Sequence, residues 1–559
     1  MDNNYVLAMY DIRAKQNYIY RTKKLKEIQG ASWIIRDCFD DFLYDAAKEY
    51  RDDKPADKET PEAIYPGPEN KRPDGGRLGV FSFDEFEARM KDQYLGEVVY
   101  DGGGNFFILF KDEDACKEIT WRFTNKLIKE RPGLNVMCTY VTDVKKDNYN
   151  NPDGTGDYQR LYDKHRINEN QESTITAWGT MPFIQADYIS SMPLTKRIKE
   201  GVDRGNKVTA EAFAKYEKFF NVSGKEKIDE KILDKLVQEK GKESLLAVIY
   251  IDGNNMGAMV QNLLKGKQTY DDCVNMLRSF SNEIQKVCVD DRKDEIDEAL
   301  EKLYKLNDRE EAKTRRLVVG AGDEITVICN ARYAFKIAKM YLENISKAEV
   351  NVNNEKKKIT SCAGIAVFHS HTPFADAYRI AEECCETGKK KMKKYNMMDA
   401  CFLDWHYCQG AIGVSLEDIR EQEEMTSCSR PWLMVGDAKN NAKEIYAWEE
   451  IEKIKDELTK LERTNIKGLA ESAKDGLLAL EMDLKRIISH KWKAEEAKEE
   501  VPELRKAFIT GETKEKQEKY KKIIFDLVLV YDIWFDESDT KEKAEEEKSE
   551  TESGVMTNE

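Results

Sequence analysis

Two segments of this chain, residues 247–257 and 316–329, constrain most strongly what it can fold into. The first reads AVIYIDGNNMG and the second reads RLVVGAGDEITVIC. Both are rich in β-branched residues, which favour strands, and each brings acidic residues to a strand end or to a tight turn. If the two strands are neighbours in one sheet, Asp252, Asp323 and Glu324 lie close together.

Glycines mark the turn in each segment. Gly320 and Gly322 flank Ala321 and predict a hairpin with a sharp turn that lets a ligand approach the backbone closely. Asp252 ends the other strand, and Gly253 opens a loop rich in glycine and asparagine that leads into a helix.

Three converging carboxylates predict a site for divalent cations. Clustered carboxylates repel one another unless a cation lies between them, and oxygen ligands suit Mg²⁺ or Mn²⁺. Two such ions beside a helix N-terminus, whose free N–H groups bind phosphates, make a nucleotidyl-transfer site. The alternative is that the acids only form the turn and that Asp252 only caps the helix.

Composition narrows the class of protein. A chain of 559 residues is expected to hold several domains, and its net charge of −16 argues against a generic basic nucleic-acid binder. The 12 cysteines form no disulfide framework and no CxxC zinc pattern. The sequence shows no signal peptide and no long apolar run, so we expect a soluble, cytoplasmic protein without a membrane partner.

The order of elements in the first part of the chain recurs later. Strand, helices, glycine-turn hairpin, helix and strand occupy residues 5–10, 16–50, 97–110, 115–130 and 134–141, and the same order runs from 247 to 369. This pattern predicts a duplicated βα unit. The expected fold class is α+β, an antiparallel sheet covered by helices on one face.

The two copies differ at the turn where chemistry is expected. The first copy has Gly102, Gly103, Gly104 and Asn105 in place of the acidic turn. Asn105 is neutral and does not help to balance two divalent cations. One copy is therefore predicted to be catalytic and the other degenerate.

Five regions are expected along the chain. They are a first copy at 1–145 with a surface insertion near 51–78, a linker region at 146–244, a second copy at 245–400, a helical domain at 401–535 and a disordered acidic tail at 536–559.

Several motifs together resemble one family. They are YRTKKLKEIQGASWIIRD, VYDGGGNFFILF, YIDGNNMG, GAGDEITVIC and AGIAVFHSHTPFADAYRIAEECCETGKKK, in this order between about residues 5 and 394. In this region the chain resembles the large, polymerase-like subunit of type III CRISPR effector complexes. The resemblance implies two ferredoxin-like palm domains, related to GGDEF nucleotide cyclases, followed by a helical C-terminal domain. It further implies that the second palm joins ATP into cyclic oligoadenylate messengers in antiviral defence.

The resemblance also implies roles for residues. Asp252, Asp323 and Glu324 would be the catalytic metal ligands for Mg²⁺ or Mn²⁺. The nucleotide would be bound by Gly253, Asn254, Asn255, Gly257, Gly322 and Lys389, and the first palm's pocket would contain Gly103, Gly104 and Asn105. ATP would be the substrate, and other CRISPR-associated subunits and guide and target RNA would be the partners. Without the resemblance, the lysines around Lys389 are equally well a solvated helix end.

Departures from the family pattern keep other functions open. The turn reads GAGDE rather than GGDD, Asn254 stands where many relatives have an acid, and the family's His-Asp nuclease motif and interpalm zinc cysteines are missing. We therefore expect a compact form without DNA-cleaving machinery. A nucleotide-binding scaffold without catalysis and a stand-alone cyclic-dinucleotide synthase are the alternatives.

Overall fold

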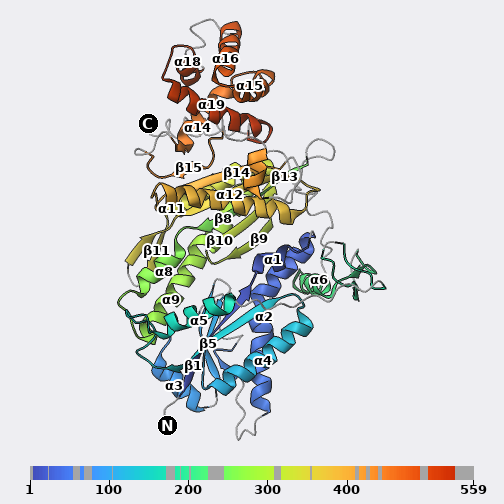
Figure 1. Ribbon diagram of the computed structural model, residues 1–559, viewed down its shortest axis with the longest axis vertical. Coiled ribbons are helices and arrows are strands. Elements are labelled where there is room, and N and C mark those ends of the chain that lie inside the picture. Colours follow the sequence, from blue (N-terminus) through green and yellow to red (C-terminus); the bar gives the residue numbers. More distant parts are fainter. Residues whose placement is uncertain are drawn as a thin grey trace, which may run out of the picture.

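The structure is a computed structural model that describes most of the chain. The described residues are 4–22, 24–53, 63–67, 78–92, 94–102, 105–170, 183–188, 190–199, 203–223, 244–306, 316–352, 355–408, 415–422, 428–438, 444–491 and 501–534. The predicted acidic tail, most of the predicted insertion, and both Gly103 and Gly104 lie outside them. Three parts follow one another along the longest axis: a first sheet with its helices, a second sheet, and a group of helices (Figure 1).

The first sheet is built from the N-terminal copy. Its strands are β1 (Tyr5–Arg13), β2 (Ile64–Tyr65), β3 (Gly96–Gly102), β4 (Asn105–Phe110) and β5 (Asn135–Val144), in the order β2-β3-β4-β1-β5. Its helices are α1 (Lys15–Tyr20), α2 (Leu25–Asp52), α3 (Phe83–Asp92), α4 (Glu113–Glu130) and α5 (Asp157–Glu169). The apolar strand β1 lies inside the sheet and pairs antiparallel with β4 and β5.

The second sheet repeats this order. Its strands are β8 (Leu245–Gly253), β9 (Arg316–Ala321), β10 (Glu324–Asn330), β13 (Ser361–His369), β14 (Cys401–Tyr407), β15 (Trp432–Val435) and β16 (Tyr446–Ala447), in the order β16-β15-β14-β13-β8-β10-β9. The segment β13-β8-β10-β9 corresponds strand for strand to β5-β1-β4-β3 of the first sheet. The predicted duplication is therefore present, and each copy has the ferredoxin-like strand order.

Helices cover both faces of the second sheet, and the expectation of one covered face was wrong. On one face lie α9 (Tyr270–Ile284), α10 (Asp291–Leu306) and α11 (Ala334–Lys347), and on the other lies α12 (Phe374–Lys394). The reason is the continuous apolar run of β8, whose neighbours Val248 and Ile249 are buried in different clusters. A strand that is apolar on both sides needs cover on both sides.

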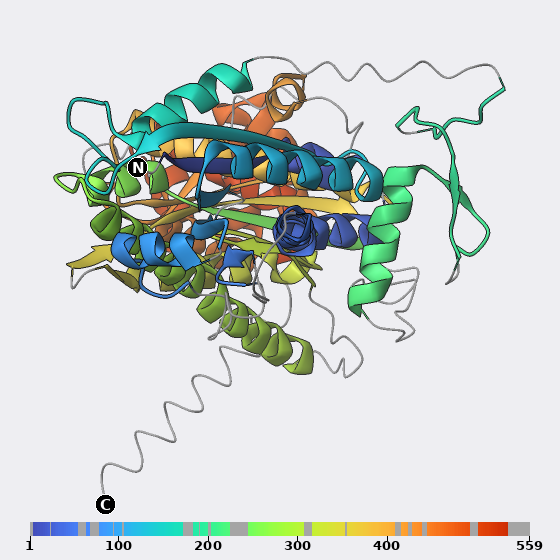
Figure 2. The same cartoon turned by 90° about the horizontal axis from the view of Figure 1, so that it is seen from below.

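Shorter elements complete the second palm. They are α8 (Met256–Leu264), the π-helical turn η1 (Gln285–Asp290), the 3₁₀ turn η2 (Ala331–Tyr333), β11 (Glu349–Val352), β12 (Glu355–Lys358) and α13 (Leu416–Gln422). Between the palms, α6 (Ala210–Ser223) and the hairpin of β6 (Lys196–Arg197) with β7 (Lys207–Val208) lie to one side of the body (Figure 2).

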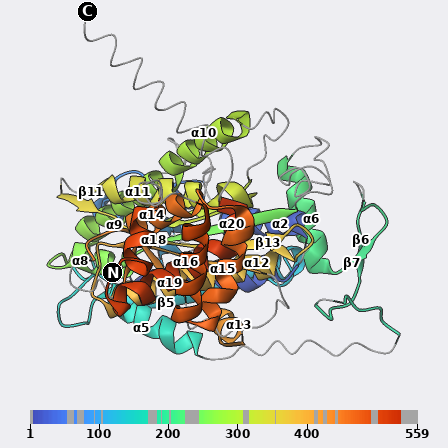
Figure 3. The same ribbon diagram turned by 90° about the horizontal axis from the view of Figure 1, so that it is seen from above.

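The second sheet continues beyond residue 400, where the helical domain was expected to begin. Strands β14, β15 and β16 extend the sheet, and the helices start at Trp448. They are α14 (Trp448–Leu458), α15 (Arg463–Asp475), α16 (Leu477–Lys491), α18 (Pro502–Phe508), α19 (Lys514–Leu529) and α20 (Tyr531–Trp534), grouped over one end of the molecule (Figure 3). Among the described residues, no helix is long and apolar enough to cross a membrane.

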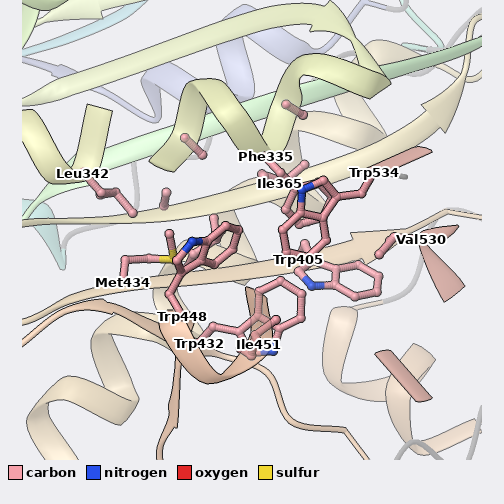
Figure 4. Close-up of a cluster of buried hydrophobic side chains, with 14 of the residues drawn as sticks. Phe335, Leu342, Ile365, Trp405, Trp432, Met434, Trp448, Ile451, Val530 and Trp534 are labelled. Carbon is pink, nitrogen blue, oxygen red and sulfur yellow. The ribbon is translucent and has the colours of Figure 1, made fainter. Parts of the chain in front are cut away.

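An aromatic cluster joins these helices to the second palm (Figure 4). The rings of Phe335 and Trp534 stack with their centroids 4.8 Å apart, and Trp448 lies 4.9 Å from Trp534. Trp405 and Trp432 of the sheet complete the contact. Such burial of large aromatic rings stabilises the docked helices, so the C-terminal helices share a core with the palm.

Arg278 of α9 joins the second palm to the first. Its guanidinium donates to the backbone carbonyls of Val98 (2.6 Å), Val99 (2.8 Å) and Gly79 (2.6 Å). The β3–β4 register shifts between Val98 and Tyr100, at the place where these carbonyls accept. Arg278 is only 7% exposed, and burial lowers the pKa of its guanidinium to about 10. A buried cation thus bonds the two palms to each other, next to the apolar cluster that both of them share.

We predict that Arg278→Met destabilises the junction of the palms. The change leaves three carbonyls without their donor in a buried place, so the free energy of unfolding should fall by about 3 kcal/mol. Urea unfolding followed by circular dichroism measures it. Arg486→Met, which removes only an exposed contact to Asp483, is the matched control and should change stability by less than about 0.5 kcal/mol. Equal effects of the two changes would contradict the role given to Arg278.

Candidate active site

Asp252 and Asp323 meet at the end of β8. The hairpin of β9 and β10 has the two-residue turn Gly322–Asp323, because Ala321 pairs with Glu324. Gly322 has φ +64°, which glycine adopts readily, and its N–H donates to Gln285 Oε1 at 2.8 Å. The turn therefore places Asp323 beside the strand end that carries Asp252.

Gly253 makes this approach possible. A Cβ atom at this position would lie 2.7 Å from Asp323 Oδ2 and 2.5 Å from Met256 Cε. Only a residue without a side chain lets the carboxylate of Asp323 pack over the strand end. The close approach of Asp323 to the strand end therefore requires glycine at position 253.

Glu324 shares the face of the sheet on which Asp252 lies. The register pairs Ile325 with Ile251, so the next positions, Glu324 and Asp252, stand opposite each other across β10 and β8. Glu324 Oε1 accepts a hydrogen bond from the hydroxyl of Tyr378 in α12 at 3.0 Å. Its carboxylate is therefore bound to the helix that covers this face.

Lys389 of α12 supplies the positive charge of the site. Its Nζ lies 2.5 Å from Asp252 Oδ2 and 2.8 Å from the carbonyl oxygen of Gly253. Burial lowers the pKa of Lys389, but the charge and hydrogen bond of Asp252, together with the neighbouring Cys385 and Cys362, raise the pKa overall. Lys389 is therefore a permanent cation between the strand end and a cleft of about 320 Å³ lined also by Tyr250, Arg379 and Glu382.

Burial, and after it like charges, raise the pKa values of the other two acids. Burial, followed by the charge of Asp252, raises the pKa of Asp323 to about 6. Burial raises the pKa of Glu324 to about 7; the Tyr378 hydrogen bond opposes this shift, and the charges of Asp252, Glu382 and Asp323 add to it. A cluster of acids that hold protons so tightly is a place where a cation replaces protons favourably.

The donor set fits a magnesium-nucleotide site with two carboxylates. Among the described residues no group of three or more His, Cys, Asp or Glu side chains is arranged to hold a metal ion. Mg²⁺, however, is usually bound by one or two carboxylates together with phosphate oxygens of the substrate and water. Asp252 and Asp323 meet this requirement, whereas Glu324 as a direct ligand stays a prediction.

The predicted nucleotide-binding residues fall into different environments. Asn254 is buried, and its side chain donates to Thr360 Oγ1 (3.1 Å) and to the carbonyl oxygen of Ala400 (3.2 Å), so it points into the core. Asn255, with φ 57°, caps α8, and Gly257 follows with open space around it. The open end of α8 is therefore formed by Asn255 and Gly257.

The first palm has a matching strand end that sequence reasoning did not single out as a site. The register pairs Asp11 with Asn105, as it places Asp252 opposite Glu324. Asp11 Oδ2 lies 3.7 Å from His165 Nε2, and Asp11 Oδ1 lies 3.9 Å from Lys15 Nζ. Aligning the two repeats on their first strands would have identified Asp11.

The two strand ends face each other across the junction of the palms. Burial lowers the pKa of Lys15 in α1, and the charges of Asp11 and of Glu324 from the opposite palm both counteract this shift. Tyr20 of α1 stacks on Tyr378 with ring centroids 3.9 Å apart. The first palm thus contributes a cation and an aromatic ring next to the carboxylates of the second.

Fold and site together define a palm-type domain, a ferredoxin-like sheet with carboxylates at its first strand end and in its hairpin turn. Residues 245–398 match the family model described as Cas10/Cmr2, second palm domain. This match confirms, for residues 245–398, the resemblance drawn from the sequence. No curated protein sequence matches the chain.

Solved structures of Csm1 assemblies are similar to the chain. The Csm1-Csm4 cassette in complex with cA4 has 13% identity and a TM-score of 0.47, with 94% of this chain and 70% of that chain covered. The Csm1-Csm4 subcomplex of the type III-A CRISPR-Csm interference complex has 14% identity and a TM-score of 0.45 over the same shares. The Csm1-Csm4 cassette in complex with pppApA has 13% identity and a TM-score of 0.41, and this chain spans 53% of the length of that chain.

We predict that Asp323→Asn stabilises the metal-free protein in a pH-dependent way. With a pKa raised to about 6, Asp323 binds its proton more tightly in the folded chain, so the free energy of unfolding falls as pH rises from about 4 to about 6. In chelator at about pH 7.5 the variant should be more stable than wild type by on the order of 1–2 kcal/mol, and at about pH 4 the difference should vanish.

Urea unfolding at both pH values measures this difference. Asp399→Asn, at an exposed position near the site, is the control and should show no such dependence on pH. A variant that is less stable than wild type by the same amount at both pH values would show that Asp323 is not under repulsion.

Proposed function

We propose that the chain is a metal-dependent nucleotidyltransferase that joins ATP into cyclic oligoadenylates at the second palm, in CRISPR-based antiviral defence. The observation that carries the proposal is the pairing of Asp252 with Asp323 at a strand end, with Lys389 beside them and the first palm opposite. The match of residues 245–398 to Cas10/Cmr2 second palms supports it.

Each side chain has a defined task in this proposal. Asp252 and Asp323 would hold Mg²⁺ or Mn²⁺, which supplies neutralisation of phosphate charge and a lower pKa for a ribose hydroxyl. Lys389, already protonated and half-buried, would face the phosphates as a point charge. Glu324, fixed by Tyr378, would add negative charge behind the carboxylate pair.

The first palm would bring the second nucleotide. Its strand end with Asp11 and Asn105 lies across the junction, and Lys15 faces Glu324 from there. Holding two nucleotides in one fixed geometry converts a bimolecular step into an effectively unimolecular one. The proposal therefore needs both palms, although only the second carries acids in its turn.

The proposed setting follows from the family. We propose that the chain acts in the cytoplasm with other CRISPR-associated subunits and with guide and target RNA. The ATP-binding partners of the site would be Lys389, Asn255, Gly257 and Gly322, which border the carboxylates or the open end of α8. Roles for Gly103 and Gly104 concern residues outside the described part of the chain.

A second candidate is a nucleotide-binding scaffold without catalysis. Lys389 occupies one oxygen of Asp252, and Tyr378 occupies one oxygen of Glu324, so two potential ligand atoms already have partners. A scaffold would bind ATP and form no phosphodiester bond. A stand-alone synthase of cyclic dinucleotides would be separated from both by the mass of its product.

We predict that purified protein with Mg²⁺ or Mn²⁺ and labelled ATP forms cyclic adenylates, alone or after addition of candidate partner subunits and target RNA. Asp252→Asn and Asp323→Asn should each lower the rate by at least about 100-fold, because each removes a metal ligand. Asp399→Asn should retain the rate. Products are resolved by mass spectrometry. Intact ATP binding without turnover in every arm would favour the scaffold.

We also predict that Gly253→Ala lowers the rate with little loss of nucleotide binding. The added methyl group would collide with Asp323 and move its carboxylate away from Asp252. A drop of about tenfold or more in rate is expected at an unchanged melting temperature within a few degrees. Gly468→Ala, where a Cβ meets nothing within 4 Å, is the matched control. Full activity of the Gly253 variant would contradict the assigned geometry.

A further inference from the structure

A second cleft lies between the second palm and the C-terminal helices. It measures about 520 Å³ and is bordered by the end of α12, the segment before β15, β16 and α19. The lining residues are Lys390, Lys391, Lys394, Tyr395, Cys428, Arg430, Pro431, Glu444, Tyr446 and Lys522. Five of these ten side chains are basic and one is acidic, in a chain whose net charge is −16.

Two of the basic groups are neutralised within the protein. Arg430 is buried, its Nε lies 3.3 Å from Asp526 Oδ1, and it donates to the carbonyl oxygen of Trp405 at 2.7 Å. Lys394 Nζ lies 3.3 Å from Glu444 Oε2 at the rim. These pairs form the floor and one edge of the cleft. The charges of the three other lysines in the lining are not neutralised by these pairs.

The remaining lysines have no acidic partner in the part of the chain that the structure describes. Lys390, Lys391 and Lys522, which come from two elements far apart in the sequence, have no carboxylate within ion-pair distance there, and the charges of Asp404, Asp526 and Glu444 reach Lys391 only from farther away. Because basic side chains outnumber acidic ones five to one in the lining, like charges there repel one another unless an anion joins them. The convergence therefore indicates a ligand rather than a structural network.

Lys391 is the most enclosed of the three. Its Nζ donates to the carbonyl oxygen of Pro431 at 3.0 Å and lies 5.3 Å from the ring centre of Tyr446. Burial lowers the pKa of Lys391 to about 8. A cation withdrawn from water in this way gains more from an anion than an exposed lysine does, because less water screens the pair.

We propose that this cleft binds phosphate groups, with Lys390, Lys391 and Lys522 as the recognising cations. Lysine is a compact point charge suited to phosphate without fixed geometry. The phosphate belongs either to a single-stranded nucleic acid or to a free polyphosphate. The site is separate from the carboxylates of the second palm and does not depend on the function proposed above.

We predict that reversing two of these charges weakens the binding. A labelled single-stranded RNA of about 12 nucleotides is titrated with full-length wild-type protein, Lys390→Glu/Lys522→Glu and the control Lys393→Glu by fluorescence anisotropy. The double variant should bind at least about tenfold more weakly, with a shallower dependence on salt, while the control changes less than about twofold. Lys393 is exposed and does not line the cleft.

Inorganic tripolyphosphate identifies the source of the phosphate. Competition at concentrations equal to those of RNA phosphate assigns the site to free polyphosphates, and competition only at large excess assigns it to the nucleic-acid backbone. No measurable binding of either probe to wild type at physiological salt, or equal weakening by all the variants, would overturn the proposal.

A second readout uses the unaltered protein. Lysine acylation mapped by mass spectrometry should show Lys391 and Lys522 protected by the bound probe and Lys393 unprotected. Protection of Lys393 to the same degree, or no protection of the cleft lysines, would also overturn the proposal. This measurement keeps the test valid if the double variant fails to fold.

Discussion

The repulsion between two carboxylates, Asp252 and Asp323, is the interaction on which the second palm depends. The sheet brings them together because one ends β8 and the other sits in the turn that precedes β10, a neighbouring strand. Lys389 offsets part of the repulsion, and Gly253 removes the atom that would keep the acids apart. The raised pKa of Asp323 shows that repulsion and burial still disfavour its charged form. The fold thus maintains a site at which binding of a cation is favourable.

The same scaffold has opposite electrostatics in the first palm. At the matching strand end Asp11 has Lys15 and His165 nearby, and the position opposite it is the neutral Asn105. One carboxylate with basic neighbours attracts no cation of its own. The strand end of the second palm is therefore acidic, whereas in the first palm basic neighbours offset the single carboxylate. This arrangement is expected if one palm carries out the chemistry and the other only binds nucleotide.

Much of this arrangement could be predicted from local sequence. The glycines and acids around residue 322 specify a two-residue hairpin, and the two strands rich in β-branched residues predict a shared sheet, both of which the structure shows. The duplication also followed from the order of elements. These features depend on short stretches whose conformational preferences agree with the fold.

Other parts depend on contacts that no local pattern reveals. The bond from Tyr378 to Glu324 joins residues from different elements, and Arg278 resembles any charged residue on an amphipathic helix until its carbonyl partners are known. The apolar run of β8 predicts burial without saying which helices cover each side, so the cover by α12 was missed. The strands after residue 400 are short, and their pairing depends on the edge of an existing sheet.

Placing both palms in one chain has a consequence for how the strand ends meet. Arg278 and the apolar cluster that spans both palms hold them together, so the two ends face each other at an effective concentration set by the fold. Dilution does not separate them, and no second copy of the chain has to be found. Any reaction that needs both ends is therefore first order in this protein.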